Sequence, residues 1–479
     1  MSRIFRDYVL YIYIYIWWYS PIWLKNQLLR INDIFQYNGI DLLSSTYVSG
    51  HKNKKGFFQS STEKCYENYK VSTEQDLRYG VPREFLYWFS GFSDAEGNFL
   101  ITIDRNYVRF RFKICLHIDD LEVLNTIKSH LKVGRVELES SRNRCSFIVS
   151  NYGDIKNVVC SIFNTFPLHT SKKLDFENFY EAVIIKDNKK LSNEGMERIM
   201  YLKDTMNTKR EIFTYNTTES QIIIDPNWLI GFIEGEGTFG IKTGSALYLQ
   251  LAQKNTSQES LNSITIFLTK LSNNVLQDSK ISPLNVVSTI NVKTNVVSLV
   301  VNSVDSLYYY VLPFLDTYKM YSRKFIDFKL WRVALLLKIQ GYYYLPSGKK
   351  LFLDISDILN KRYSTNTTGD ISGIIDEILK RSETIFEQDP PFDVKSNISH
   401  SDNVWKFSIQ NRSDNPKVVY IYTTEGMIEG SPFVSYSSAH KALGLNPSSN
   451  TCNRYIDTGR LYKNTYIFSS NPIDRTSRD

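Results

Sequence analysis

The chain has 479 residues, several times the length of an average domain, so it can bury more than one core and we expect roughly two to four domains. Its 42% apolar and 22% charged residues are values of a globular protein, and its net charge of +7 is compatible with a polyanionic partner. The five cysteines are odd in number and lack metal-ligand spacing, which argues against a disulfide framework and a zinc module.

Residues 1–80 form an N-terminal extension with one apolar run, YVLYIYIYIWWYSPIWL, at residues 8–24. This run is at the short limit for a transmembrane helix. It lacks a small-residue cleavage site and the flanks of an export signal. Three interpretations stay open: a short membrane anchor, a packing or insertion segment, and translated sequence in front of the working domain.

Two similar helices follow, each predicted to end at a glycine. WFSGFSDAEGNF occupies residues 88–99 and WLIGFIEGEGTF occupies residues 228–239. Pro82 and Pro226 stand where a first helical turn begins, and Asp225 is a good N-cap. Both helices carry acids in the last turn, where the helix dipole disfavours negative charge. Two such helices in one chain require an explanation.

The segments after these helices also repeat. In both copies, short alternating strands and further helices follow, and TFPLHTSKKLDF (165–176) aligns without a gap to TYKMYSRKFIDF (317–328). The sequence therefore predicts an α+β fold with two αββαββα units related by a pseudo-twofold axis. We expect the units at residues 81–207 and 226–363, joined by a linker at residues 208–225, with an insertion in the second copy.

A small third unit is expected at residues 416–472, after a linker at residues 364–415. Within it, residues 437–443 read as a short helix that ends at Gly444, and Asn446 and Pro447 read as the start of a second helix. This order is typical of a helix-turn-helix.

Small residues line one face of each repeated helix. Residues four apart share a helical face, so Gly91 pairs with Ala95 and Gly231 with Gly235. Such patches let two helix backbones approach closely. One interpretation is plain packing; the other is that the two helices form the interface between the units.

If the helices pack through these patches, Glu96 and Glu236 emerge side by side. The two carboxylates then repel each other unless a cation lies between them. Hard oxygen ligands of this kind suit Mg²⁺, and a shared metal suits phosphodiester hydrolysis. The alternative is that each acid is simply solvated at a helix end.

The strand after the first helix alternates apolar and basic residues, as VRFRFKI at residues 108–114. One face would be core and the other could follow a DNA groove, unless it is merely solvated. The second copy is polar but less charged at these positions, so the two halves would read different half-sites. The candidate DNA-binding residues are Arg109, Arg111 and Lys113 in the first copy and Tyr248, Gln250 and Lys254 in the second.

FSGFSDAEG (89–97) and LIGFIEGEG (229–237) resemble the two signature motifs of single-chain LAGLIDADG homing endonucleases. The resemblance covers residues 82–363. It implies two αββαββα units packed through the signature helices, saddle-shaped sheets on double-stranded DNA, and Mg²⁺-dependent cleavage of both strands of a long asymmetric site by a monomer.

The resemblance also implies roles for single residues. The family's metal-binding acids fall on Glu96 and Glu236, where Glu replaces the Asp of the family name. Lys172 and Lys324 fall where the family often has a basic residue near the scissile phosphates; the alternative is two ordinary surface lysines. Gln253 occupies the position of a water-orienting polar residue.

In the first copy, Leu116 occupies the position that is equivalent to Gln253, which puts symmetric catalysis in doubt. The C-terminal unit resembles helix-turn-helix modules appended to intron-encoded nucleases, and such proteins are commonly encoded in fungal mitochondria, consistent with the residue usage of this chain. Two rival functions are an RNA maturase that binds the intron, with or without residual cleavage, and a DNA-binding protein whose chemistry is lost. Retained acids in both motifs favour the enzyme.

Overall fold

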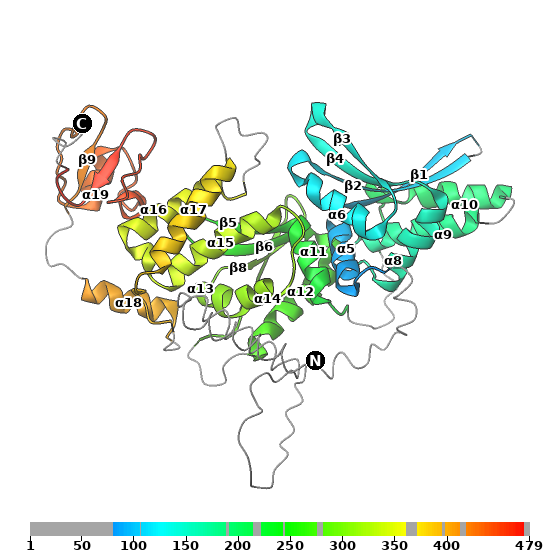
Figure 1. Ribbon diagram of the computed structural model, residues 1–479, viewed down its shortest axis with the longest axis horizontal. Helices are drawn as coiled ribbons and strands as arrows, with labels where there is room; N and C mark the ends of the chain where they lie inside the picture. The colour runs from blue at the N-terminus through cyan, green and yellow to red at the C-terminus, as the bar shows by residue number, and fades with distance from the viewer. Residues whose placement is uncertain are drawn as a thin grey trace, which may run out of the picture. The chain divides into compact units, whose positions relative to one another are not determined.

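Figure 1 shows the computed structural model of the chain. It describes residues 80–105, 107–187, 191–213, 222–242, 245–274, 281–360, 371–394, 398–411 and 418–473. The apolar run at residues 8–24, with its three interpretations, lies outside these ranges. Among the described helices, none combines the length and apolar character that crossing a bilayer requires.

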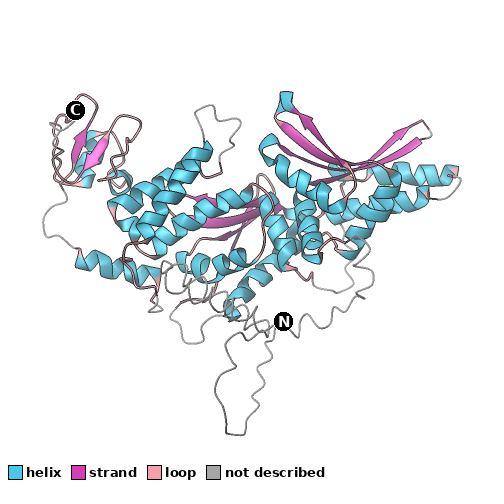
Figure 2. Cartoon of the chain, in the orientation of Figure 1, coloured by secondary structure: helices cyan, strands magenta, loops and turns pink. Residues whose placement is uncertain are grey.

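The first unit is a four-stranded antiparallel sheet with helices on one face (Figure 2). The strand order is β1-β2-β4-β3, so the two hairpins of the unit meet along β2 and β4. The elements are α5 (Arg83–Glu96), β1 (Gly97–Asp104), β2 (Tyr107–His117), α6 (Leu121–Leu131), β3 (Arg135–Glu139), β4 (Arg144–Val149), α7 (Tyr152–Asp154), α8 (Cys160–Thr165), α9 (Lys172–Lys186) and α10 (Asn193–Asp204).

The second unit repeats this topology with the strand order β5-β6-β8-β7. The predicted α+β class and element order are therefore confirmed, and the extra length of the second copy lies between α12 and β7. The elements are α11 (Pro226–Glu236), β5 (Gly237–Ile241), β6 (Leu247–Lys254), α12 (Gln258–Lys270), β7 (Val287–Asn291), β8 (Val296–Val301), α13 (Val304–Ser306), α14 (Leu312–Thr317), α15 (Lys324–Ile339) and α16 (Pro346–Ile358).

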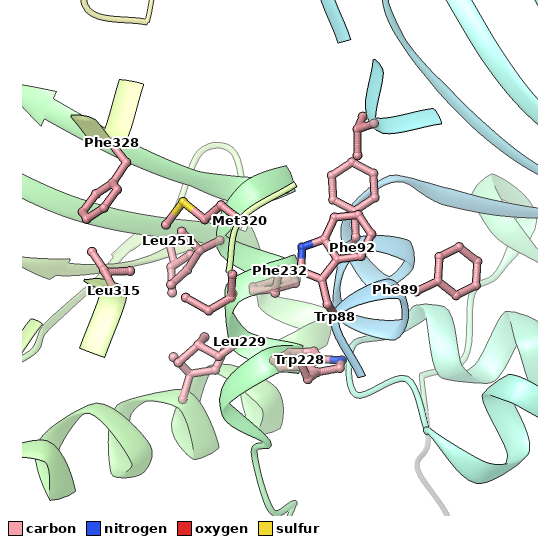
Figure 3. Packing of buried hydrophobic residues seen from close by; sticks show 14 of the residues in the cluster. Trp88, Phe89, Phe92, Trp228, Leu229, Phe232, Leu251, Leu315, Met320 and Phe328 are labelled. Atoms are coloured by element: carbon pink, nitrogen blue, oxygen red, sulfur yellow. The ribbon is translucent and has the colours of Figure 1, made fainter. Parts of the chain in front are cut away.

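Alternation along the strands separates core from surface. In β2, Val108, Phe110 and Phe112 are buried, whereas Arg109 and Arg111 are exposed. A strand with this period buries one face only, so the helices cover the apolar side of each sheet. The aromatic residues of α5 and α11 meet this core from between the sheets (Figure 3).

Each unit is closed by an asparagine in the left-handed conformation, Asn207 with φ of 55° and Asn360 with φ of 61°. The Asn207 main-chain N–H donates to Asp175 Oδ1 at 2.9 Å, and its side-chain amide donates to a carbonyl oxygen of β1 at 3.0 Å. Asn360 makes the same two bonds, to Asp327 Oδ1 at 3.0 Å and to a carbonyl oxygen of β5 at 2.7 Å. Both aspartates lie in the first turn of a long helix, α9 or α15.

The segment predicted as a linker at residues 364–415 differs from that expectation, because it contains α17 (Ile371–Phe386) and α18 (His400–Gln410). Helix α17 packs on α15 and α16. It buries Ile375, Ile378 and Ile385 in the main core. Its charged residues lie on the other side of the helix, whereas its apolar residues recur at helical spacing.

The C-terminal unit has a small core of its own, formed by Val419, Ile421, Ala439, Cys452, Ile456 and Phe468. It combines α19 (Tyr436–Ala442) and α20 (Thr451–Tyr455) with a ladder of β9 (Tyr420–Tyr422) and β10 (Ile467–Ser469). The second helix begins later than expected, because Asn446 Oδ1 accepts from the N–H of Ser448 and forms a turn. The helix-turn-helix role of this unit stays a prediction.

Candidate active site

Helices α5 and α11 touch through their backbones. A Cβ atom built on Gly91 would lie 1.9 Å from the carbonyl oxygen of Trp228, and one built on Gly231 would lie 2.1 Å from that of Trp88. One turn later, a Cβ on Gly235 would lie 2.2 Å from Cβ of Ala95. No larger side chain fits at the glycines, so the structure brings the two predicted small-residue patches together.

The first acid of the last turn of α5, Asp94, is buried and fully used in hydrogen bonds. It accepts from Trp228 Nε1 of the opposite helix at 3.2 Å. It also accepts from the main-chain N–H groups of His169 at 2.5 Å and Thr170 at 3.2 Å. Burial raises the pKa of Asp94, and these donors oppose that rise. Asp94 thus ties α5 to α11 and to the segment that begins α9.

Glu234 is the equivalent acid of α11. It accepts from Trp88 Nε1 at 2.6 Å and from the main-chain N–H groups of Tyr321 at 3.0 Å and Ser322 at 2.5 Å. Burial raises its pKa as well. One acid in each helix therefore accepts hydrogen bonds that join its helix to the opposite helix and to the start of α9 or α15, which the sequence did not predict.

The second acids, Glu96 and Glu236, lie half-buried at the ends of the same helix pair. Burial raises the pKa of both carboxyl groups, and the charge of Glu236 raises the pKa of Glu96 further. The two carboxylates are thus close enough to repel each other, as their placement at the end of the small-residue interface requires.

Lys172 and Lys324 begin α9 and α15 and cover the ends of the two motif helices. Lys172 Nζ donates to the carbonyl oxygens of Ser93 at 3.2 Å and Ala95 at 2.9 Å, and Lys324 Nζ donates to that of Gly237 at 2.7 Å. Each lysine therefore offsets the negative end of a helix dipole.

These lysines also act on the paired carboxylates. Both lower the pKa of Glu96 and of Glu236, in opposition to burial. Burial lowers the pKa of Lys172 itself, although the surrounding carboxylates, Asp94 first, oppose that shift. Neither lysine is fully exposed, which disfavours the interpretation as ordinary surface residues.

The strand register shows that Leu116 and Gln253 are equivalent positions. Gly97 pairs with Ile114, and Gly237 pairs with Leu251, so the residues two places further along β2 and β6 correspond. The Gln253 side chain hydrogen-bonds Glu236 and lowers the pKa of that carboxyl group. Leu116 has no polar side-chain atom, so it cannot do the same for Glu96.

A second difference between the units lies beside the lysines. Arg323 Nε lies 3.7 Å from Asp120 Oδ1 of the other unit, and both side chains are about 10% exposed. At the equivalent place, Ser257 Oγ accepts from the N–H of Ser171 at 3.1 Å. The charge of Asp120 also raises the pKa of Glu96. One side of the site thus has an ion pair where the other has a neutral contact.

Residues 89–183 and 229–335 match the LAGLIDADG endonuclease family. The chain belongs to this family. The match covers the C-terminal parts of both motif helices, both sheets and most of the helices behind them.

Fungal proteins are among the relatives of this LAGLIDADG chain. It is 26% identical to the uncharacterized mitochondrial protein RF1 of Saccharomyces cerevisiae, over 92% of this chain and 94% of that protein. It is 31% identical to the probable intron-encoded endonuclease 3 of Neurospora crassa, over 33% of each chain. The chain thus spans about a third of the length of the latter. These relatives agree with the fungal mitochondrial origin predicted from the sequence.

Solved structures confirm the two-unit LAGLIDADG fold. I-SmaMI bound to an uncleaved DNA target with calcium ions is 20% identical, with a TM-score of 0.50 over 58% of this chain and 99% of that one. The I-SmaMI homing endonuclease bound to cleaved DNA is 19% identical, with a TM-score of 0.50 over 57% of this chain and 96% of that one.

LAGLIDADG endonucleases are metal-dependent nucleases. Within the described residues, no cluster of three or more His, Cys, Asp or Glu side chains could hold a metal ion. The available donors at the motif ends are the carboxylates of Glu96 and Glu236. Their mutual repulsion and their hard oxygen atoms fit a divalent cation that keeps several water ligands.

Proposed function

We propose that the protein is a site-specific endonuclease that hydrolyses both strands of a long, asymmetric DNA target in fungal mitochondria, with Mg²⁺ held by Glu96 and Glu236. The observation that carries this proposal is the convergence of two repelling carboxylates at the ends of backbone-packed helices, between two lysines. A bound Mg²⁺ ion would activate a water molecule and stabilise the leaving oxygen at the scissile phosphate.

The chain's own residues complete the site. Lys172 and Lys324 supply positive charge to the phosphates, from positions fixed by hydrogen bonds to the helix ends. Gln253 holds Glu236 by a hydrogen bond and presents an amide group that can orient water. The outer strand faces would bind the duplex on either side.

The maturase alternative is less well supported. An RNA-binding protein gains nothing from paired negative charge at its centre, because its affinity comes largely from phosphate contacts. Both motif acids are retained, which also argues against a DNA-binding protein without chemistry. Residues Arg109, Arg111, Lys113, Tyr248, Gln250 and Lys254 remain candidates for contact with DNA.

The test uses the full chain with Mg²⁺ on fungal mitochondrial DNA that lacks the intron, with every new end mapped by sequencing. One discrete double-strand cut is expected. It should be abolished by EDTA and reduced about 10³-fold or more in the Glu96→Gln, Glu236→Gln double variant, since a metal contributes several kcal/mol to the transition state.

The matched control replaces Glu122 and Glu259 by Gln. These glutamates are exposed, stand in the first turns of α6 and α12, and are not among the charges that shift the pKa of Glu96 or Glu236. The control should cut like the native chain. A cut that persists in the Glu96→Gln, Glu236→Gln variant would contradict the proposal.

A further inference from the structure

The two sheets present outer faces of different chemistry. On each sheet, the outer face consists of the residues that alternate with the buried ones and pair with each other across the strands. We call these sets the first face and the second face. The first face comprises Asn98, Leu100, Thr102, Asp104, Tyr107, Arg109, Arg111, Lys113, Cys115, His117, Arg135, Glu137, Glu139, Arg144, Ser146 and Ile148, of which Ser146 and Ile148 on β4 are themselves buried. The second comprises Thr238, Gly240, Tyr248, Gln250, Ala252, Lys254, Val287, Thr289, Asn291, Val296, Ser298 and Val300.

The first face is rich in guanidinium, ammonium and carboxylate groups. Arg111 stands opposite Leu100, and Lys113 stands in one row with Asn98 and, through β4, with Arg135. Arg135 Nε lies 2.6 Å from Glu137 Oε1, so one arginine is held by an acid of the same face. The first face thus presents planar, forked donors beside carboxylates at positions set by the strand register.

The second face carries amides, hydroxyls and methyl groups; among its paired strand residues Lys254 is the charged member, and Lys242 adds an ammonium group beside Tyr248. Gln250 Nε2 donates to Ser298 Oγ at 3.3 Å across β6 and β8, which fixes the orientation of the amide. Around Gln250 stand the small or branched side chains of Thr238 and Val300, with Val287 beyond them on β7. The surface near this amide is therefore apolar.

Tyr248 lies flat on this face. A Cβ atom on its cross-strand partner Gly240 would lie 2.0 Å from the tyrosine ring, so the ring occupies the space above the glycine. The Lys242 ammonium lies 5.6 Å from the ring centroid. Tyr248 thus covers Gly240 instead of projecting from the sheet, with the Lys242 ammonium above its ring.

Base edges in the major groove distinguish these two chemistries. Guanine presents two acceptors that pair with Arg or Lys, and cytosine presents a donor that suits Glu. Adenine pairs with the amide of Gln, and the methyl group of thymine favours apolar contact. The first face therefore matches G·C pairs, and the second face matches A·T pairs.

We propose that the DNA target is divided in composition: the half bound by the first face is rich in G·C at its read positions, and the half bound by the second face is rich in A·T. Arg111 and Lys113 are the specificity determinants of the first half, and Gln250 is that of the second. This inference rests on the proposed function, because it takes the outer faces as the DNA-binding surfaces.

The test selects duplexes with a randomised target region on the full chain in Ca²⁺, followed by sequencing of the bound molecules. The native chain should enrich one asymmetric site with a G·C-rich half and an A·T-rich half. Arg111→Ala should relax base preference in the G·C-rich half only, by about 5- to 150-fold at one position, and Gln250→Ala should do the same in the A·T-rich half. Glu122→Gln is the control that should change neither half.

Two results would overturn the division. One is that the half of the target in which Arg111→Ala relaxes base preference has the same G·C content as the half in which Gln250→Ala does. The other is that Arg111→Ala weakens binding to all sequences equally, which would mean that Arg111 contacts phosphates only. Enrichment of a divided site by a chain that never cuts DNA would contradict the proposed endonuclease while supporting this inference, so the two failures are distinguishable.

Discussion

The two LAGLIDADG units agree in their frame and differ at its edges. Both use a glycine against an opposing carbonyl, a buried acid that accepts an indole N–H, and a left-handed asparagine that closes the unit. The first unit has Leu116 at the position where the second has Gln253. One side of the site has the Asp120–Arg323 ion pair, where the other has the contact between Ser171 and Ser257. The units differ again on the outer strand faces.

This contrast shows which positions the fold itself requires. The shared contacts are backbone contacts or hydrogen bonds to buried carboxylates, and any change leaves a clash or an unpaired polar group. The differing positions lie beside the proposed catalytic centre or on exposed strands, where a substitution alters one half of the site alone. Divergence between the units is therefore a map of what each half does with its own DNA strand and half-site.

The largest expected effect tests the shared frame. Gly91→Ala and Gly231→Ala each place a methyl group about 2 Å from a carbonyl oxygen, so the helices must separate. Each variant should lose about 3 kcal/mol or more of unfolding free energy in urea, and the two losses should be equal. Gly195→Ala, whose Cβ would meet flexible side chains at 3.0 Å, is the control and should lose less than about 1 kcal/mol. Unequal losses for Gly91 and Gly231 would break the symmetry of the frame.

The ion pair beside the site should give the next largest difference. Arg323→Met leaves Asp120 and Asp327 buried without this guanidinium, so it should cost about 3–5 kcal/mol of unfolding free energy. Ser257→Ala, which alters the neutral Ser171–Ser257 contact on the other side of the site, should cost about 1 kcal/mol. Similar losses in both variants would show that the two sides are energetically alike.

The pH dependence of cleavage should separate the two lysines. Metal binding needs ionised Glu96 and Glu236, whose pKa values burial raises, so activity should fall with acidification at a pH above the ordinary range of a glutamate. Lys172 lowers both pKa values, so Lys172→Met should move this acidic limb to higher pH and reduce the cleavage rate about 10²-fold. Lys324→Met should move the limb less, since Lys324 is the weaker influence on both carboxyl groups. A pH profile unchanged by Lys172→Met would contradict this account.

The smallest effect concerns the balance between the two strands. The Gln253 hydrogen bond is one difference between the Glu236 side and the Glu96 side, and such a bond is worth about 0.5–1.5 kcal/mol, or about 2- to 10-fold in rate. The two strands should therefore be nicked at unequal rates, as measured with each strand end-labelled. Either Leu116→Gln or Gln253→Leu should bring the rates closer. A rate ratio that neither variant changes would mean that the asymmetry has another source.

The repeated topology and the helix interface could be predicted from the sequence because both depend on local residue patterns. These patterns are visible without knowledge of any tertiary contact: small residues four apart, alternation in β2, and proline at the helix starts. The acids Glu96 and Glu236 became candidate metal ligands because the repeat marked them twice.

Contacts between residues far apart in the sequence could not be predicted from local patterns. Asp94 and Glu234 bind an indole of the opposite helix, and nothing near them in the sequence identifies Trp228 or Trp88 as the donor. The one trace was that each motif opens with a tryptophan and carries two acids where one metal ligand suffices. Helix α17 was missed for a related reason, since only its contacts with α15 and α16 show that its apolar stripe belongs to the core.

The asparagine closures have a consequence for how such chains can change. Because Asn207 and Asn360 each bind within their own unit, neither closure uses a side chain of the other unit. Contact between the signature helices, in contrast, combines backbone proximity at two glycines with the indole-to-carboxylate bonds of Trp88 to Glu234 and Trp228 to Asp94. A gene fusion that exchanged one unit for that of another LAGLIDADG protein would therefore need a glycine, a tryptophan and a buried acid at the matching helix positions, and it would join one inherited half-site to a new one.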